Sequence, residues 1–239
     1  MRVPTLLLRR IHKWIGLILG LQFVLWTVSG AMMALLDMDA VAGGKSRAQA
    51  ASRAFPVNSA AWPRVQGLLA DQPIIGVAVR PLLDRHVFEV TAPAGVRLFS
   101  AADGRPIVIN AALAGDVAKA SYAARGRVKS VAPLENLTLA VREHALPIWR
   151  VDFADAENSS YYVSGETGKL LERRNDKWRA WDFFWMLHNM DYLNRTSFNH
   201  PLIIAVGFGI VWLAITGFWL LFKTAWRPDV RALRRRISK

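Results

Sequence analysis

The sequence of 239 residues contains no cysteine. This absence excludes a disulfide framework, a metal site built on thiolates and a cysteine nucleophile. The chain also lacks the phosphate-binding loop G-x-x-x-x-G-K-[ST], the nucleophile elbow G-x-S-x-G and the zinc-binding pair H-E-x-x-H. A hydrolase or NTPase function therefore has no support in the sequence.

Charged residues are absent from two long segments, 14–36 and 200–222. As a helix that rises about 1.5 Å per residue, each segment would span roughly 34 Å, slightly more than the hydrocarbon core of a bilayer. We therefore predict transmembrane helices at 14–37 and 199–222, with tails at 1–13 and 223–239.

Acidic residues are scarce in the two tails. Eleven basic residues and one acidic residue lie there, so the tails carry +10 of the formal net charge of +13. Basic residues next to membrane helices mark the cytoplasmic side. The pattern predicts that both termini are cytoplasmic and that the segment between the helices lies across the membrane. No nucleic-acid partner is expected.

Residues 38–60 are mostly small and polar, which indicates a linker after the first helix. Within this segment, Ala40-Val41-Ala42 resembles a signal-peptidase site. The apolar stretch before it is longer than the apolar region of an ordinary signal peptide, so we expect an uncleaved membrane anchor.

The central region combines helical and strand-like patterns. Its periodicity predicts helices at 61–70 and 111–123. Alternating or β-branched segments predict six strands. These strands are expected at 74–80, 86–91, 96–100, 148–153, 160–163 and 169–173.

Two parts of this region resemble one another. When LFSAADGRPI is aligned with YVSGETGKLL, Gly104 falls opposite Gly168. Each glycine suits a tight turn with positive φ between two strands. Upstream, the Pro-Ile pair at 73–74 falls opposite the pair at 147–148, which would give the first copy about ten extra residues. We predict a repeated unit of one helix and a three-stranded sheet.

Several short motifs follow one another in an order that resembles a known family. The first helix opens with RRIHKWIGLILGL and ends in TVSGAM, a repeated unit closes with a T-G-K turn, and WDFFWMLHNMDY precedes the last helix. In these motifs the chain resembles, over nearly its whole length, the PepSY-associated transmembrane proteins of bacterial inner membranes. Many members of that family have four or more transmembrane helices, whereas two are predicted here.

The resemblance implies a membrane α+β fold. Two transmembrane helices would flank a periplasmic α+β region at 61–180, made of two PepSY-like units at about 61–110 and 111–175. Each unit would contain a helix and an antiparallel sheet. An aromatic helix at 181–198 would lie at the membrane interface. Larger relatives are haem-bearing membrane reductases.

His12 lies at the cytoplasmic end of the first helix, and Gly16 and Gly20 follow it on one face. Glycines here would remove side chains that clash with a flat macrocycle bound by the imidazole. They would equally allow a second helix to approach closely, with His12 only an interfacial residue. The family resemblance favours haem, because the first-helix histidine matches a position that the larger relatives use as a ligand.

His188 lies on a helical face with Trp181, Phe184 and Trp185. Tryptophans suit a membrane interface, but a neutral imidazole among them needs a partner. His200 follows at the start of the second apolar segment. Nearby polar residues could hold an imidazole tautomer or a carboxylate. These residues are Asn194, Arg195 and Asn199.

One haem could not join all three histidines, because about 25 residues of helix, or roughly 37 Å, separate His12 from the other two. Two haem layers in a homodimer, or a membrane partner, would supply the missing ligands; His188 and His200 of one chain could also pair. Axial histidine pairs favour electron transfer over oxygen chemistry. The resemblance thus implies haem b bound by His12, His188 and His200, with Gly16 and Gly20 beside it.

Other candidate residues have simpler roles. His86 and His144 are expected at the surface. Asp152, Asp155 and Glu157 could together bind a hard cation, although such clusters are more often solvated turns. No flavin is expected, because neither SGETGK nor TVSGAM has the complete attachment motif.

Two functions therefore remain open. The resemblance implies an inner-membrane electron-transfer protein that reduces a periplasmic acceptor, such as ferric iron or a ferric siderophore, with electrons from a quinol or a cytoplasmic donor. The alternative is a membrane-anchored PepSY interaction module without a cofactor. Its sheet edges would bind or restrain a periplasmic protein or peptidase.

Overall fold

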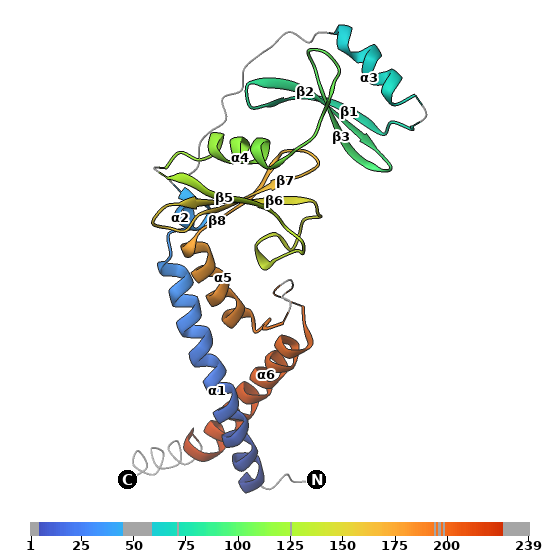
Figure 1. The fold of residues 1–239 in the computed structure, drawn as a ribbon. Helices are drawn as coiled ribbons and strands as arrows, with labels where there is room; N and C mark the ends of the chain where they lie inside the picture. Colours follow the sequence, from blue (N-terminus) through green and yellow to red (C-terminus); the bar gives the residue numbers. More distant parts are fainter. Residues whose placement is uncertain are drawn as a thin grey trace, which may run out of the picture. The chain divides into compact units, whose positions relative to one another are not determined.

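The computed structural model describes residues 5–44, 59–70, 72–124, 126–193, 195, 197 and 199–226. They form two compact units (Figure 1). The helical unit contains Met1–Leu35 and Trp181–Lys239, and the sheet unit contains Leu36–Ala180. Most of the predicted linker lies outside the described residues, and its first part forms a short helix, α2 (Met38–Val41).

Two long apolar helices make up most of the helical unit, α1 (Thr5–Leu35) and α6 (Pro201–Leu221). Both are long and apolar enough to cross a membrane, in agreement with the prediction. A short π-helix, η4 (Phe222–Trp226), continues α6. Since α1 begins at Thr5, well before residue 14, the basic residues near His12 belong to the same helix. The two helices cross in the N-terminal half of α1 (Figure 1).

A third helix, α5 (Asp176–Asn189), begins earlier and ends earlier than the predicted segment 181–198. Asn175 caps its start, because the side-chain oxygen accepts a hydrogen bond of 2.8 Å from the backbone N–H of Trp178. The helix ends after Asn189 because Met190 has a φ of 56°, which an α-helix does not allow.

The sheet unit contains two antiparallel sheets of four strands, ordered β1-β2-β3-β4 and β5-β6-β7-β8. The first consists of β1 (Gly76–Leu82), β2 (Arg85–Ala92), β3 (Gly95–Ser100) and β4 (Pro106–Ile107). The second consists of β5 (Arg127–Pro133), β6 (Ile148–Ala154), β7 (Ser160–Ser164) and β8 (Leu170–Arg174). The remaining helices are η2 (Ser59–Ala61), α3 (Trp62–Leu68), α4 (Ala111–Ala120) and η3 (Leu139–Val141).

The prediction of three strands in each sheet is wrong. It omits β4, which has two residues, and the whole of β5. In β5 the partly buried residues Val128 and Val131 are three positions apart, because Lys129 is an extra residue in a β-bulge. The bulge breaks the period of two by which a strand is recognised.

The repeat is present, but its alignment differs from the prediction. Gly104 and Gly168 have φ of 70° and 66°, and each lies between the third and fourth strands of its sheet, as expected. The pairing of 73–74 with 147–148 is wrong, because 73–74 precede a first strand whereas 147–148 lie at the start of a second. The apparent insertion in the first copy therefore results from aligning the start of a first strand with the start of a second strand.

Both sheets and α4 contribute to one apolar core of the sheet unit. Leu82, Val87 and Leu98 come from the first sheet and pack in the same cluster as side chains of the second sheet. The partners from the second sheet are Val151, Phe153, Tyr161 and Val163. Helix α4 adds Ala114, Val117 and Ala118. The two repeats are therefore packed together within this unit.

An ion-pair network also joins the two sheets. The carboxylate of Glu89, on β2, lies 2.5 Å from Nε of Arg80 and 2.7 Å from Nζ of Lys169, beside β8. Arg80 also donates a hydrogen bond to the backbone carbonyl of Thr167. Burial raises the pKa of Glu89, but the hydrogen bonds and charges of Lys169 and Arg80 outweigh burial and lower the pKa below 4.5.

We predict that Glu89→Gln lowers the free energy of unfolding by about 1–2 kcal/mol near neutral pH. Because the pKa of Glu89 is lower in the folded state, its stabilisation is present above the unfolded pKa and is lost as the pH falls through the folded pKa. The difference between variant and parent should therefore shrink in acid. Chemical unfolding of the detergent-solubilised protein, followed by circular dichroism between pH 3 and 7, measures it.

The matched control is Glu135→Gln, at an exposed position of the same unit. It should leave the stability unchanged at every pH. Equal losses in both variants, or a Glu89→Gln loss independent of pH, would contradict the ion-pair account.

Candidate histidine sites on the apolar helices

Glycine allows α1 and α6 to approach one another closely. A Cβ at Gly209 would lie 2.8 Å from Cδ1 of Leu19, too close for a real side chain. One turn away, a Cβ at Gly16 would lie 3.8 Å from Cδ2 of Leu213, an ordinary van der Waals distance. Small residues at helix interfaces serve this purpose in membranes, where packing takes over from the hydrophobic effect. Gly16 thus lies at a helix contact.

His12 is held by α6 at one end of this crossing. Its Nδ1 lies 2.7 Å from Oγ1 of Thr216, whose hydroxyl lies 2.8 Å from the backbone carbonyl of Trp212. A hydroxyl has one proton, so Thr216 donates to the carbonyl and accepts from Nδ1–H of His12. The lone pair of the neutral imidazole is then on Nε2.

His188, on α5, is held by α1 in the same manner. Its Nδ1 lies 3.2 Å from Oγ of Ser29 and 3.3 Å from the backbone carbonyl of Trp26. The buried hydroxyl of Ser29 donates to the carbonyl of Leu25 at 2.6 Å. Both neighbours of Nδ1 are therefore acceptors, so Nδ1 carries the proton and Nε2 the lone pair.

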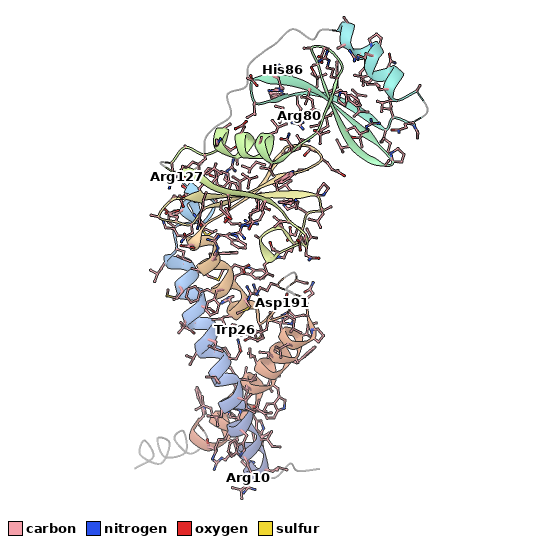
Figure 2. All side chains as sticks on the ribbon, in the orientation of Figure 1. Arg10, Trp26, Arg80, His86, Arg127 and Asp191 are labelled. Atoms are coloured by element: carbon pink, nitrogen blue, oxygen red, sulfur yellow. The ribbon has the colours of Figure 1, made fainter. Side chains whose placement is uncertain are left out.

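A glycine follows the hydroxyl residue at each site. A Cβ at Gly30 would lie 3.2 Å from Cε1 of His188, and a Cβ at Gly217 would lie 3.3 Å from Cε1 of His12. At each site the imidazole therefore lies directly against the helix backbone, because glycine has no side chain between them. Tryptophans lie nearby, with Trp26 and Trp212 at ring-centroid distances of 6.5 and 6.3 Å from their histidines. Figure 2 shows Trp26 on the stretch of α1 beside α5.

The two sites are closer than predicted but remain separate. His188 contacts Ser29, which lies between four and five helical turns after His12 on α1. At the rise of an α-helix, positions 12 and 29 are separated by roughly 26 Å, less than the predicted distance of roughly 37 Å. The difference arises because α5 packs beside α1 and places His188 within the apolar segment. One macrocycle still cannot reach both imidazoles.

Three buried donors of the helical unit have no hydrogen-bond partner among the described residues. They are Nε2 of Gln22 and Nε1 of Trp26, both on α1, and Nδ2 of Asn189, next to His188. A Cβ at Gly20 would meet no atom within 4 Å, so α1 adjoins open space on the side of Gly20, away from Gln22 and Trp26. Unpaired donors in an apolar environment are unfavourable, so the arrangement fits a further group with acceptor atoms.

His200 has a different environment. It is the N-cap residue of α6, and its Nε2 donates to the backbone carbonyl of Asn189 at 2.8 Å. Ligation through Nε2 would break this bond. Of the polar residues expected to help, Arg195 instead pairs with buried Asp182 at 2.8 Å, and Asn194 lies outside the described residues.

The remaining candidates have partners of their own. His144, expected at the surface, places Nε2 2.9 Å from the carboxylate of Glu172. His86 is partly buried in β2. The three carboxylates expected near a hairpin do not share a site. Asp152 binds Arg150, Asp155 accepts from Tyr122, and Glu157 binds Lys177, at 2.9, 2.9 and 2.8 Å. No group of three possible metal ligands occurs in the described part of the chain.

Comparison with known families agrees with this architecture. A family model described as the PepSY-associated TM region matches residues 9–239. The chain belongs to the PepSY-associated transmembrane family. It is therefore a membrane protein with a PepSY region, and α1 and α6 are its two candidate membrane spans. No curated protein and no solved structure gives a significant match.

The sequence identified both histidines of this PepSY-associated protein but not the residues that hold them. Each apolar segment contains one hydroxyl-glycine pair, Ser29-Gly30 and Thr216-Gly217. That pairing is a signal that could have been found, because both residues are rare in a helix selected only for hydrophobicity. Which histidine meets which pair depends on how the helices cross.

We predict that Gly30→Val destabilises the helical unit by about 1–3 kcal/mol, because the added methyl groups overlap the ring of His188. The control is Gly20→Val on the same helix, where a Cβ meets nothing within 4 Å. Thermal unfolding in detergent, followed by tryptophan fluorescence, compares the two. An equal effect of both substitutions would show that crowding at His188 is not the cause.

The absence of cysteine makes the helix crossing directly testable. We expect Gly16→Cys combined with Leu213→Cys to form an intramolecular disulfide under mild oxidation, because a Cβ at Gly16 would lie 3.8 Å from Cδ2 of Leu213. The control combines Gly16→Cys with Phe208→Cys, whose parent side chain is 73% exposed. Proteolysis in the sheet unit followed by non-reducing electrophoresis detects the link. A link in the control pair alone would contradict the observed helix faces.

Proposed function

We propose that this protein binds b-type haem through His12 and His188 and carries electrons across the bacterial inner membrane to a periplasmic acceptor. Ferric iron or a ferric siderophore is the proposed acceptor class, and a quinol or a cytoplasmic protein is the proposed donor. One observation carries the proposal. Each imidazole donates Nδ1–H to a helix hydroxyl and has no partner at Nε2 among the described residues.

This arrangement suits metal ligation because a ligating histidine commonly donates its second ring N–H to an acceptor. The acceptor keeps the lone pair on the ligating nitrogen and holds the plane of the ring. Ser29 and Thr216 provide this support from within apolar helices. In a structural role alone, a histidine inside a membrane segment would be a costly choice.

The surroundings of the histidines support the same proposal. The unpaired donors of Gln22 and Trp26 could bind the carboxylates of a haem, and Gly20 leaves space on another side of α1. Haem held by two imidazoles would supply single-electron transfer. The protein would hold the imidazoles, exclude water and separate two haem layers along α1.

A second copy of the chain would complete the ligand sets. Within the described residues, His12 has no second histidine near its end of α1, and His200 uses Nε2 for the carbonyl of Asn189. A homodimer would pair His12 with the matching residue of a second chain, and likewise His188. One haem per chain is the expected content. His200 would then stabilise the junction between α5 and α6.

A second candidate function follows from the sheet edges. β1 is the first strand of its sheet, and Ile75, Val77 and Val79 at this edge are 69%, 44% and 37% exposed. An exposed apolar edge can accept an extended segment of another protein. Under this alternative the protein is a membrane-anchored binding module without a cofactor.

The deciding experiment is the absorption spectrum of the protein purified in detergent from haem-replete cells, oxidised and then reduced with dithionite. We expect a sharp reduced α-band, and about one haem per chain by pyridine haemochrome assay. His12→Ala and His188→Ala should each lose a large part of the haem. Ser29→Ala should weaken haem retention about 10- to 100-fold.

The matched control is His144→Ala, which removes a histidine of the sheet unit and should retain full haem content. Thermal unfolding of each variant distinguishes loss of ligation from loss of folding. A colourless, folded parent protein would exclude the haem proposal and favour the binding module.

A further inference from the structure

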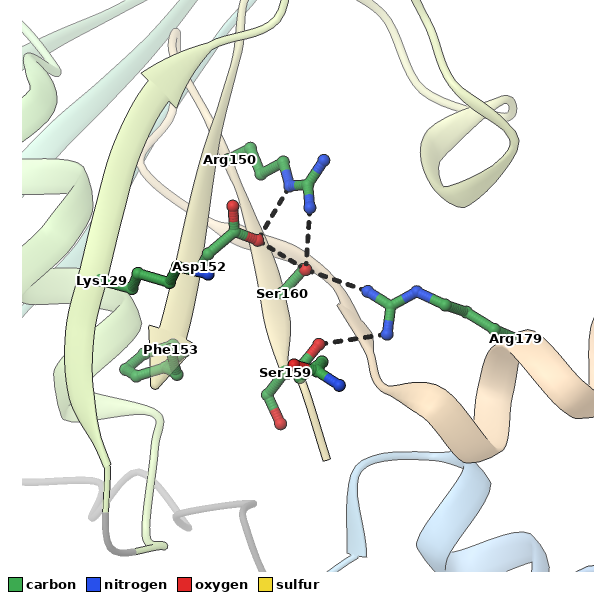
Figure 3. Close-up of a pocket in the computed structure, with 8 residues that line it drawn as sticks. Lys129, Arg150, Asp152, Phe153, Ser159, Ser160 and Arg179 are labelled. Carbon is green, nitrogen blue, oxygen red and sulfur yellow. Dashed lines mark hydrogen bonds and ion pairs between the residues drawn. The ribbon is translucent and has the colours of Figure 1, made fainter. Parts of the chain in front are cut away.

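A basic pocket lies within the sheet unit, where β5, β6, β7 and the start of α5 meet (Figure 3). Its volume is about 120 Å³. The charged lining residues are Lys129, Arg150, Arg179 and Asp152, which together carry two net positive charges. Ligand sites for drug-sized molecules commonly measure about 300–1,000 Å³, so this pocket suits a single small chemical group.

Two arginines converge on one oxygen in this pocket. Nη2 of Arg150 lies 3.4 Å from Oγ of Ser160, and Nη2 of Arg179 lies 3.2 Å from the same oxygen. Ser160 donates its proton to Asp152 at 2.6 Å, so its hydroxyl can only accept from the arginines. Both guanidinium groups therefore point their N–H donors toward the same place in the pocket.

Each arginine is paired with one carboxylate, Arg150 with Asp152 and Arg179 with Asp176. Both oxygens of Asp152 are already used by Arg150, Ser160 and Ser130. Asp176 pairs with one nitrogen of Arg179 at 2.8 Å, from the same helix. Each guanidinium group has five N–H donors, so the pairs leave further donors available.

The third cation is placed by a backbone irregularity. Lys129 is the extra residue of the bulge in β5, between Val128 and Ser130, and it is exposed. A bulge redirects one side chain out of the regular alternation, and such bulges are frequent beside functional sites. The lysine has no ion pair or hydrogen bond with any residue that the structure describes, so its ammonium group is available to a ligand.

We propose that this pocket binds a small soluble oxyanion, either a phosphate or the carboxylate of an organic acid. Guanidinium groups match the geometry of both groups and form strong charge-assisted hydrogen bonds with them. Lys129 adds a third positive charge, and Ser160 orients the two arginines. The site belongs to the sheet unit alone, so it is independent of haem. Arg179 lies on α5, the helix that also carries His188.

The test is isothermal titration of the full-length protein in neutral detergent with inorganic phosphate and, separately, with citrate. Chloride at matched ionic strength is the reference. Saturable binding at one site per chain is expected. Lys129→Gln and Arg179→Gln should each weaken it about tenfold or more, because each removes a charge-assisted hydrogen bond. Lys129→Gln breaks no internal bond, so it should fold normally.

The control is Lys119→Gln, which removes the same charge from an exposed ion pair on α4 and should leave binding unchanged. Absence of saturable binding for both anions, or equal weakening in the control, would overturn the proposal. Tight binding of phosphatidylglycerol in mixed micelles, abolished by Lys129→Gln while free phosphate does not bind, would also overturn it in favour of a lipid headgroup.

Discussion

An imidazole within an apolar helix pair needs a hydrogen-bond partner, and the helical unit is organised around this requirement. Water is scarce in such an environment, so the partner must come from a neighbouring helix. Ser29 and Thr216 qualify because each first satisfies its own proton on a carbonyl of its helix and then accepts from a histidine. The glycine after each hydroxyl lets the ring reach it.

The same requirement links local packing to the proposed chemistry. Fixing the proton on Nδ1 leaves the lone pair of both rings on Nε2, the atom that the proposed haem ligation requires. The sheet unit solves a different problem. Its two repeats share one core and are joined by Glu89 between Arg80 and Lys169, which makes a single body of the two sheets. Its pocket presents positively charged side chains, whereas the helical unit fixes the position of the proton on two histidines.

Much of the fold was predictable from local patterns. The absence of charge in two segments identified α1 and α6, and the turn glycines Gly104 and Gly168 adopt the positive φ expected of them. The errors lie where tertiary context overrides pattern. The bulge at Lys129 disguised β5, and the end of α5 at Asn189 depends on a positive φ at Met190, a residue whose type does not indicate it.

For the candidate site, the sequence by itself determined which residues are available. Only five histidines exist, three of them, His12, His188 and His200, beside or within the helices of the helical unit, and no cysteine competes as a ligand. The tertiary structure decided what each histidine does. It paired His12 with Thr216 and His188 with Ser29, across 204 and 159 residues, and turned His200 to a backbone carbonyl. Contacts between helices depend on the crossing of their backbones, and residues so distant in the chain carry no periodic signal of their meeting.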